Sequence, residues 1–175
     1  MKRVTVFGSS KCSPGDPAYE SAYKIGQLLG EFKFSVATGG YQGTMEAISK
    51  GASEYSVEVM GCTTPDLFLG RKGGNQYLNN EIKSTELSER IGNLIKYSNI
   101  IIVLPGTIGT LTELLLVWNQ EFIKECNSIE RSHTIYLDES FWKPVLEEMS
   151  NDLQLPLGVL NYYSDENDLM SKISN

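Results

Sequence analysis

The sequence has few of the residues on which metal, disulfide and serine-hydrolase chemistry depend. Its 175 residues include one histidine, His133, and three widely spaced cysteines, Cys12, Cys62 and Cys126. A single histidine excludes a histidine-rich metal site, and three scattered cysteines form neither a disulfide framework nor a zinc-ligand pattern. A Ser-His-Asp hydrolase is not expected either, because the chain has no G-x-S-x-G turn. We therefore expect reduced thiols, a cytoplasmic location and no bound metal.

Long apolar runs and an excess of positive charge are also missing. No run is long enough to cross a bilayer, and residues 1–4 lead into a strand pattern and do not resemble a signal peptide. Fifteen Lys and Arg against 22 Asp and Glu leave a formal net charge of −7. This charge argues against general nucleic-acid binding, which needs clustered cations. It does not exclude a small anionic ligand, because backbone amides bind phosphate without lysine.

The pattern that is present is typical of an α/β protein, and we expect residues 1–175 to form a single nucleotide-binding domain. Short, continuous apolar runs, typical of strands covered on both faces, alternate with helical patterns. The expected strands are 4–7, 34–38, 57–60, 99–104, 134–137 and 160–163, and the expected helices are 17–29, 43–52, 87–97, 111–123, 141–149 and 165–173. This alternation predicts a Rossmann-like open parallel sheet with helices on both faces. The intervening segment 70–75 is either a surface linker or a mobile cationic lid over an anion.

Three glycine-rich turns, 8–10, 39–44 and 105–110, follow predicted strands at the edge where α/β sheets bind ligands. The last two open helices, whose free amides and dipole attract phosphate or carboxylate. Structural glycines would explain the turns equally well. The chain has neither the Walker G-x-x-x-x-G-K-[ST] pattern nor G-x-G-x-x-G after its first strand, so neither site type is expected. The predicted phosphate- or nucleotide-binding residues are Gly8, Ser9, Gly39, Gly40, Gly43, Thr44, Pro105, Gly106, Thr107, Gly109 and Thr110.

Two charged residues, Arg90 and Glu113, favour a reaction at this edge. Glu113 follows Thr110 by three positions, so it could complement the helix dipole or form a capping box with Thr110. Arg90 alone could be a surface or ion-pair residue. Beside a phosphate cradle, however, the two could act at an anomeric carbon. The carboxylate would stabilise an oxocarbenium ion and orient or deprotonate water, while the cation would hold a phosphate or ribose hydroxyl.

Several motifs together resemble the LOG (Lonely Guy) family, often mislabelled as lysine decarboxylases. Residues 105–113, PGTIGTLTE, resemble its P-G-G-x-G-T-x-x-E signature, and residues 38–47 resemble its G-G-x-x-G-x-M motif. The 8–10 turn and Glu89-Arg90 match its G-S-S turn and E-R pair, so the resemblance covers about residues 3–119.

The resemblance implies a Rossmann-like homodimer that binds a nucleoside 5′-monophosphate. Its implied activity is phosphoribohydrolase, which hydrolyses AMP or a cytokinin riboside 5′-monophosphate to the free base and ribose 5-phosphate. Arg90 and Glu113 occupy the matching catalytic positions. No cofactor and no lysine decarboxylase chemistry are implied.

Two departures from the family pattern keep a second function open. Thr107 stands where the family has its second glycine, which could narrow the cradle or only require a negative φ. Ile91 stands where the family commonly has lysine, which is expected to remove a positive charge near the site. Related branches include proteins of unassigned activity and molybdenum-cofactor carriers. The alternative is therefore a non-catalytic carrier of a nucleotide or phosphorylated cofactor.

Single residues outside the motifs receive structural predictions. Trp118 and Trp142 are expected in the core or at a dimer interface, and Met45 in the core. Tyr41 is a candidate contact to a base or phosphate, whereas His133 has no evident partner and receives no role. The strongly apolar helix after Thr110 favours self-association.

Overall fold

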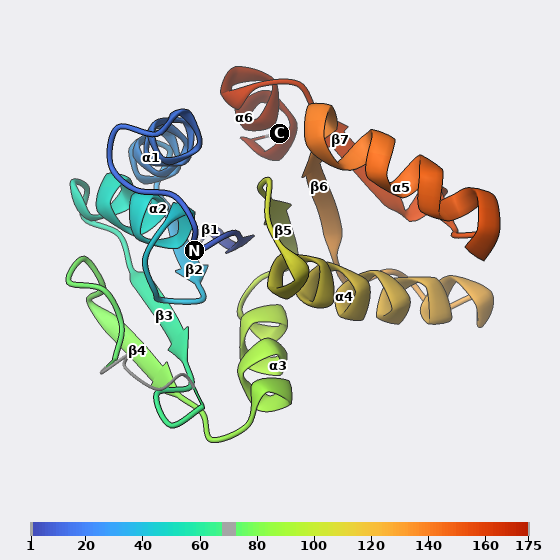
Figure 1. The fold of residues 1–175 in the computed structure, drawn as a ribbon, viewed down its shortest axis with the longest axis horizontal. Coiled ribbons are helices and arrows are strands. Elements are labelled where there is room, and N and C mark those ends of the chain that lie inside the picture. The colour runs from blue at the N-terminus through green and yellow to red at the C-terminus, as the bar shows by residue number, and fades with distance from the viewer. Residues whose placement is uncertain (1, 68–72, 175) are drawn as a thin grey trace.

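The computed structural model describes residues 2–67 and 73–174, and its strands form one parallel sheet with helices on both faces (Figure 1). The strand order is β4-β3-β2-β1-β5-β6-β7, and all neighbouring strands are parallel. The strands are β1 (Lys2–Phe7), β2 (Phe34–Thr38), β3 (Val59–Thr63), β4 (Asn80–Lys83), β5 (Ile100–Val103), β6 (Thr134–Asp138) and β7 (Leu160–Tyr163). The helices are α1 (Pro17–Glu31), α2 (Thr44–Ser53), α3 (Leu87–Tyr97), α4 (Ile108–Cys126), α5 (Glu139–Leu153) and α6 (Glu166–Ser174), with a short 3₁₀ turn at Leu157–Val159. The predicted α/β, Rossmann-like architecture is confirmed.

The strand order reverses direction at β1, and this reversal sets the position of the site. The chain passes outward from β1 through β2 and β3 to β4, then returns through α3 to β5 on the other side of β1. In the register, Val6 of β1 lies between Thr38 of β2 and Ile102 of β5. The connections after β1 and β5 therefore diverge at the carboxyl edge and leave a crevice between them.

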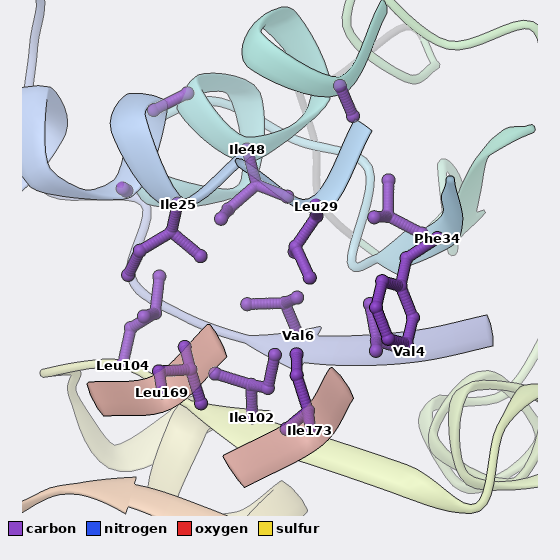
Figure 2. Close-up of a cluster of buried hydrophobic side chains, with 14 of the residues drawn as sticks. Val4, Val6, Ile25, Leu29, Phe34, Ile48, Ile102, Leu104, Leu169 and Ile173 are labelled. Carbon is purple, nitrogen blue, oxygen red and sulfur yellow. The ribbon is translucent and has the colours of Figure 1, made fainter. Parts of the chain in front are cut away.

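One face of the sheet is covered by α1, α2 and α6, whose apolar side chains meet over the central strands (Figure 2). Ile25 of α1, Ile48 of α2 and Leu169 of α6 pack with Val4 and Val6 of β1. All five side chains are almost fully buried. Burial of this kind contributes about 1.5–3 kcal/mol per large aliphatic side chain, so this face provides a rigid base for the turns above it.

The other face is covered by α3, α4 and α5. Leu94 of α3 and Leu114 of α4 pack with the strand side chains of this face. Trp118 and Trp142 are each only 2% exposed, and the Trp142 indole donates to the Leu104 carbonyl at 3.0 Å. The predicted core position of both tryptophans is therefore confirmed, and Trp142 anchors the end of β5.

The largest differences from the sequence prediction are at β3 and β4, and both have physical reasons. Strand β4 was not predicted, because its sequence N-E-I-K is polar and mostly exposed at the sheet edge, where charge discourages further pairing. Strand β3 extends through Gly61, which the sequence pattern suggested as a terminator. Gly61 lies inside the strand at a crowded position, where a Cβ would overlap Leu78 Cδ1 and lie 3.2 Å from the Gly40 Cα.

The segment proposed as a surface linker or a cationic lid is only partly described. Residues 70–72, which contain both of its cations, lie outside the described residues. Within the described part, Gly74 N donates to the Glu81 carboxylate at 2.9 Å, and Asn75 N donates to the Gly40 carbonyl at 2.7 Å. In a separate finding, none of the helices in the described ranges is long and apolar enough to span a membrane.

Candidate active site

A cavity of about 240 Å³ opens at the carboxyl edge, between the turn after β1 and the start of α4. Its walls come from four separate segments: the β1 turn, the β2–α2 region, α3 and α4. The lining residues are Gly8, Ser10, Tyr41, Met45, Arg90, Thr107, Ile108, Gly109, Thr110 and Glu113. The structure thus brings both predicted catalytic residues to one cavity with part of the predicted binding set.

Arg90 and Glu113 form a buried ion pair in this cavity. Arg90 Nη1 lies 3.0 Å from Glu113 Oε1, and each residue is 6% exposed. The guanidinium also donates from Nε to the Cys62 carbonyl at 2.7 Å and from Nη2 to the Gly39 carbonyl at 3.2 Å. These three bonds use three of the five N–H groups of an arginine, so at most two remain for a ligand.

Burial raises the pKa of Glu113 to about 7, even though the charge and hydrogen bond of Arg90 act in the lowering direction. The capping box suggested by the sequence does not form. Helix α4 begins at Ile108, ahead of the expected start, and the Thr110 hydroxyl donates instead to the Gly8 carbonyl at 3.0 Å. Glu113 is therefore a buried carboxyl group suited to exchanging a proton near neutral pH.

Gly39 provides space for the arginine and is not part of the cavity wall. A Cβ at Gly39 would overlap Arg90 Nη2 and lie 2.6 Å from Met45 Sδ. Tyr41 covers the guanidinium with its ring, whose centroid lies 5.8 Å from Arg90 Cζ, and its hydroxyl accepts from Thr64 N at 2.8 Å. The turn after β2 therefore holds Arg90 in place, and Met45 is buried beside it as predicted.

The turn after β1 is attached to the start of α2. Thr44 N donates to the Ser9 carbonyl at 2.9 Å, and Ser9 N donates to the Thr44 hydroxyl at 2.8 Å. Gly43 has φ +78°, and a Cβ there would overlap the Ser9 carbonyl oxygen. The predicted binding residues Ser9, Gly43 and Thr44 thus join two turns and do not line the cavity. Gly40, Pro105 and Gly106 are also absent from its wall.

The start of α4 forms one wall of the cavity and has unused hydrogen-bond donors. The first bond within this helix runs from Leu111 N to the Thr107 carbonyl at 3.0 Å. The amides of Ile108, Gly109 and Thr110 come before this bond, in the first turn, where an α-helix provides no carbonyl acceptor. None of the three donates to another group of the described residues. These amides are therefore available to an anion at the positive end of the helix dipole.

The two departures from the family pattern have structural explanations. Thr107 has φ −115° and ψ −166°, an extended conformation that any residue adopts, so no glycine is required there. Its side chain makes no capping bond within the described residues and lines the cavity. Ile91 is 4% exposed and packs in the core beneath α3. Ile91 does not line the cavity, and the expectation that it removes a positive charge near the site stays a prediction.

A second buried carboxylate on α4 was not predicted from the sequence. Glu121 is fully buried and contacts His133, the residue for which the sequence suggested no partner. The two are separated by 12 positions and a turn, so no helical or strand periodicity connects them. A buried glutamate within an apolar helix, followed by the chain's single histidine, was the available signal.

A protein-family model and several curated relatives match this chain. The model described as the SLOG cluster4 family (LDcluster4) covers residues 1–139. A pyrimidine/purine nucleotide 5′-monophosphate nucleosidase from Escherichia coli (strain K12) is 29% identical over 119 residues, which are 64% of this chain and 26% of the relative. A cytokinin riboside 5′-monophosphate phosphoribohydrolase, LOG5, from Arabidopsis thaliana is 30% identical over 123 residues, 69% of this chain and 54% of the relative. The matched regions thus span about a quarter and about half of these relatives.

A solved structure has the same fold over nearly the whole chain. The molybdenum cofactor binding protein from the phototrophic bacterium Rippkaea orientalis superposes with a TM-score of 0.71 at 20% identity. The match covers 98% of this chain and 94% of that chain. At this level of identity, the similarity shows a shared fold alone.

Proposed function

This chain belongs to the SLOG cluster4 family, and from that premise we propose that it is a nucleoside 5′-monophosphate phosphoribohydrolase. Its substrate is AMP or a modified, cytokinin-type AMP, and its products are the free base and ribose 5-phosphate. The observation that carries the proposal is the buried Arg90–Glu113 pair in a cavity beside the free amides of α4. The names of both curated relatives support the same reaction class.

The proposed reaction follows from the chemistry of these groups. The substrate phosphate binds the amides of Ile108, Gly109 and Thr110, which places the sugar near Glu113. A water oxygen attacks C1′ while the bond to the base nitrogen breaks and its electron pair leaves with the base. Glu113 accepts the proton that the water releases, and that proton is then transferred to the departing base. Arg90 holds the carboxylate and binds the sugar or phosphate with its remaining N–H groups.

The alternative is a non-catalytic carrier of a nucleotide or phosphorylated cofactor. A neighbour of the same fold is a molybdenum cofactor binding protein, whose name gives the kind of ligand that this alternative would take. In this case the amides at the start of α4 bind phosphate as before. Arg90 and Glu113 then shape the cavity without turning over the ligand.

One experiment separates the two functions. The purified chain is incubated with a panel of nucleoside 5′-monophosphates, while its melting temperature and the released base are followed, the latter by chromatography. The enzyme gives free base and ribose 5-phosphate in equal amounts. A carrier gives ligand-dependent stabilisation without product. Absence of both across the panel contradicts nucleotide binding altogether.

We further propose a cytoplasmic homodimer without general affinity for nucleic acids. Support for self-association comes from a hollow of about 450 Å³ on the outer side of α4, lined by apolar residues such as Leu115, Phe122 and Leu153 and by no charged side chain. Exposed apolar surface of this kind is typical of subunit contacts. Light scattering on the purified chain tests it, with a monomer mass as the contradicting result.

A further inference from the structure

A second cluster of charged groups lies away from the cavity, where the loop after α4 meets α3. Glu121 of α4 is fully buried and accepts three hydrogen bonds. His133 Nδ1 lies 2.7 Å and Lys124 Nζ 2.8 Å from its Oε1, and Ser132 N donates to its Oε2 at 2.7 Å. Burial alone would raise the pKa of this carboxyl, but the bonds from His133, Lys124 and the loop amides lower it to about 2. Glu121 is therefore an anion at all ordinary pH values.

The other ring nitrogen of His133 also faces an acceptor. Nε2 lies 3.0 Å from the carbonyl oxygen of Ile95. Ile95 is in the last turn of α3, where the carbonyls lack intrahelical donors and form the negative end of the helix dipole. A carboxylate and a carbonyl oxygen carry no proton to donate. A neutral ring has only one N–H, so the lone pair of its other nitrogen would face one of the two oxygens and be repelled by it.

We infer that His133 is an imidazolium in the folded protein and that it positions α3 against α4 by donating one N–H to Glu121 and the other to the Ile95 carbonyl. The positive charge of Lys124 disfavours the second ring proton of His133, because the Lys124 ammonium and the ring both contact Glu121 Oε1. The group of α3 that faces the ring is the carbonyl of Ile95. In the loop that carries His133, the Ser132 amide donates to the same Glu121 carboxylate.

This clamp acts on the two helices that carry the cavity's ion pair, and in this respect the inference rests on the proposed function. Arg90 lies five residues before Ile95 on α3, about 7.5 Å along the helix axis, and Glu113 lies eight residues before Glu121 on α4, about 12 Å. Both helices also pack on the sheet, and the contacts of His133 add a direct connection between them at the ends remote from the cavity. We therefore expect His133 to restrict their relative rotation and so to help set the distance at which Arg90 meets Glu113.

The protonation state can be measured without any activity. Because the chain has one histidine, full-length protein labelled with ¹⁵N-histidine gives one pair of ring signals. At pH 7 we expect both nitrogens at protonated chemical shifts, with both N–H protons protected from exchange. One nitrogen at the shift of an unprotonated imidazole overturns the inference. In Glu121→Gln, which keeps the shape and removes the charge, we expect the ring to lose one proton at pH 7.

The positioning role is tested with His133→Gln, with Lys143→Met as the matched control at an exposed ion pair. We expect His133→Gln to lower kcat about tenfold with KM unchanged, and to move the carboxyl ¹³C titration of Glu113 to higher pH because Arg90 is held less closely. Lys143→Met changes neither. An unmoved Glu113 titration overturns positioning even if the protein has no turnover, which separates this failure from failure of the proposed reaction. If His133→Gln does not fold, the Glu113 titration is measured in Glu121→Gln instead. A shift to higher pH supports the positioning role, and an unmoved titration overturns it.

Discussion

The two buried carboxylates of α4 differ in the number of hydrogen-bond donors around them. Within the described residues, Glu113 has one donor group, Arg90, and burial raises its pKa to about 7. Glu121 has donors from two side chains and the loop backbone, and its pKa is lowered to about 2. Both residues lie on one helix and both are buried. At Glu113 the effect of burial exceeds that of its donor, whereas at Glu121 the donors outweigh burial, and this balance decides whether a carboxyl can exchange protons near pH 7.

The same contrast distinguishes a reactive region and a structural region within helix α4. A carboxylate with few donors is costly to the fold, and such groups are typical of reactive sites. A carboxylate with all its donors satisfied ties elements together. The first turns of α4 therefore form the candidate reactive end, and the turns around Glu121 form a structural end. The predictions below test this division.

The largest expected effect is on turnover at the reactive end. Glu113→Gln is expected to lower kcat by about 10³-fold, because the amide cannot accept the proton of the attacking water. The protein is expected to remain folded, because the amide still accepts from Arg90, but its melting temperature falls since the buried guanidinium loses its counter-charge. Base release measured by chromatography checks the rate. A decrease in kcat of less than about threefold would show that Glu113, like Glu121, has a structural role and does not act in the reaction.

The pH dependence of the reaction follows from the raised pKa of Glu113. The carboxyl must be ionised to accept a proton, so the rate is expected to rise about tenfold per pH unit below about 7 and to level off above it. Initial rates from pH 5 to pH 9 measure this limb. Glu113→Gln should lack the limb, and a flat profile in the unaltered protein contradicts the assignment.

Removing the one donor of Glu113 is the next largest change. Arg90→Met is expected to lower kcat about 10²-fold and to destabilise the fold by about 3 kcal/mol, because the carboxylate loses its buried partner. The pKa of Glu113 should rise further without the neighbouring charge, so the acid limb moves to higher pH. Rates and thermal melts across pH check both effects. An unmoved limb would show that Arg90 does not control Glu113.

At the structural end, the expected effect is on stability. Glu121→Gln is expected to cost about 2 kcal/mol at pH 7, the range for hydrogen bonds to a charged group. The lowered pKa of Glu121 gives the sign of the acid response: its contribution is complete above about pH 4.3, the ordinary glutamate value, and is lost as the pH falls toward about 2. Urea unfolding at pH 7, 4 and 2.5 measures it. Parallel pH curves for both proteins would contradict the prediction.

The smallest effect tests how the cavity holds its arginine. Gly39→Ala is expected to lower kcat about tenfold and to cost about 1–2 kcal/mol, because the added methyl group displaces the Arg90 guanidinium. Gly92→Ala is the control on α3, where an added Cβ meets nothing within 4 Å. It should stabilise the helix by about 0.5–1 kcal/mol and leave kcat unchanged. Equal behaviour of the two variants would disprove the role of Gly39.

Much of this fold could be predicted from the sequence because its signals are local. Continuous apolar runs and helical spacing identified every strand except β4, whose polar residues belong to an exposed edge. Arg90 and Glu113 were expected to act together beside the cradle, and the family resemblance supported this, but their direct contact could not be predicted because no periodicity relates residues on different helices. The real partner of Gly39 is a guanidinium 51 positions away. Contacts of this kind form between elements that are distant in sequence, so local patterns do not predict them. The partners of His133 were not predicted for the same reason.

The division of the cavity among distant segments also bears on the biosynthesis of this protein. Its walls extend from residue 8 to residue 113, so no wall is complete until α4 has been synthesised and β5 has inserted beside β1. Closing such long loops is slow compared with forming single helices. A chain in which these segments have not yet come together is therefore expected not to bind a ligand in this cavity, and binding would report that the sheet from β1 to β5 has assembled.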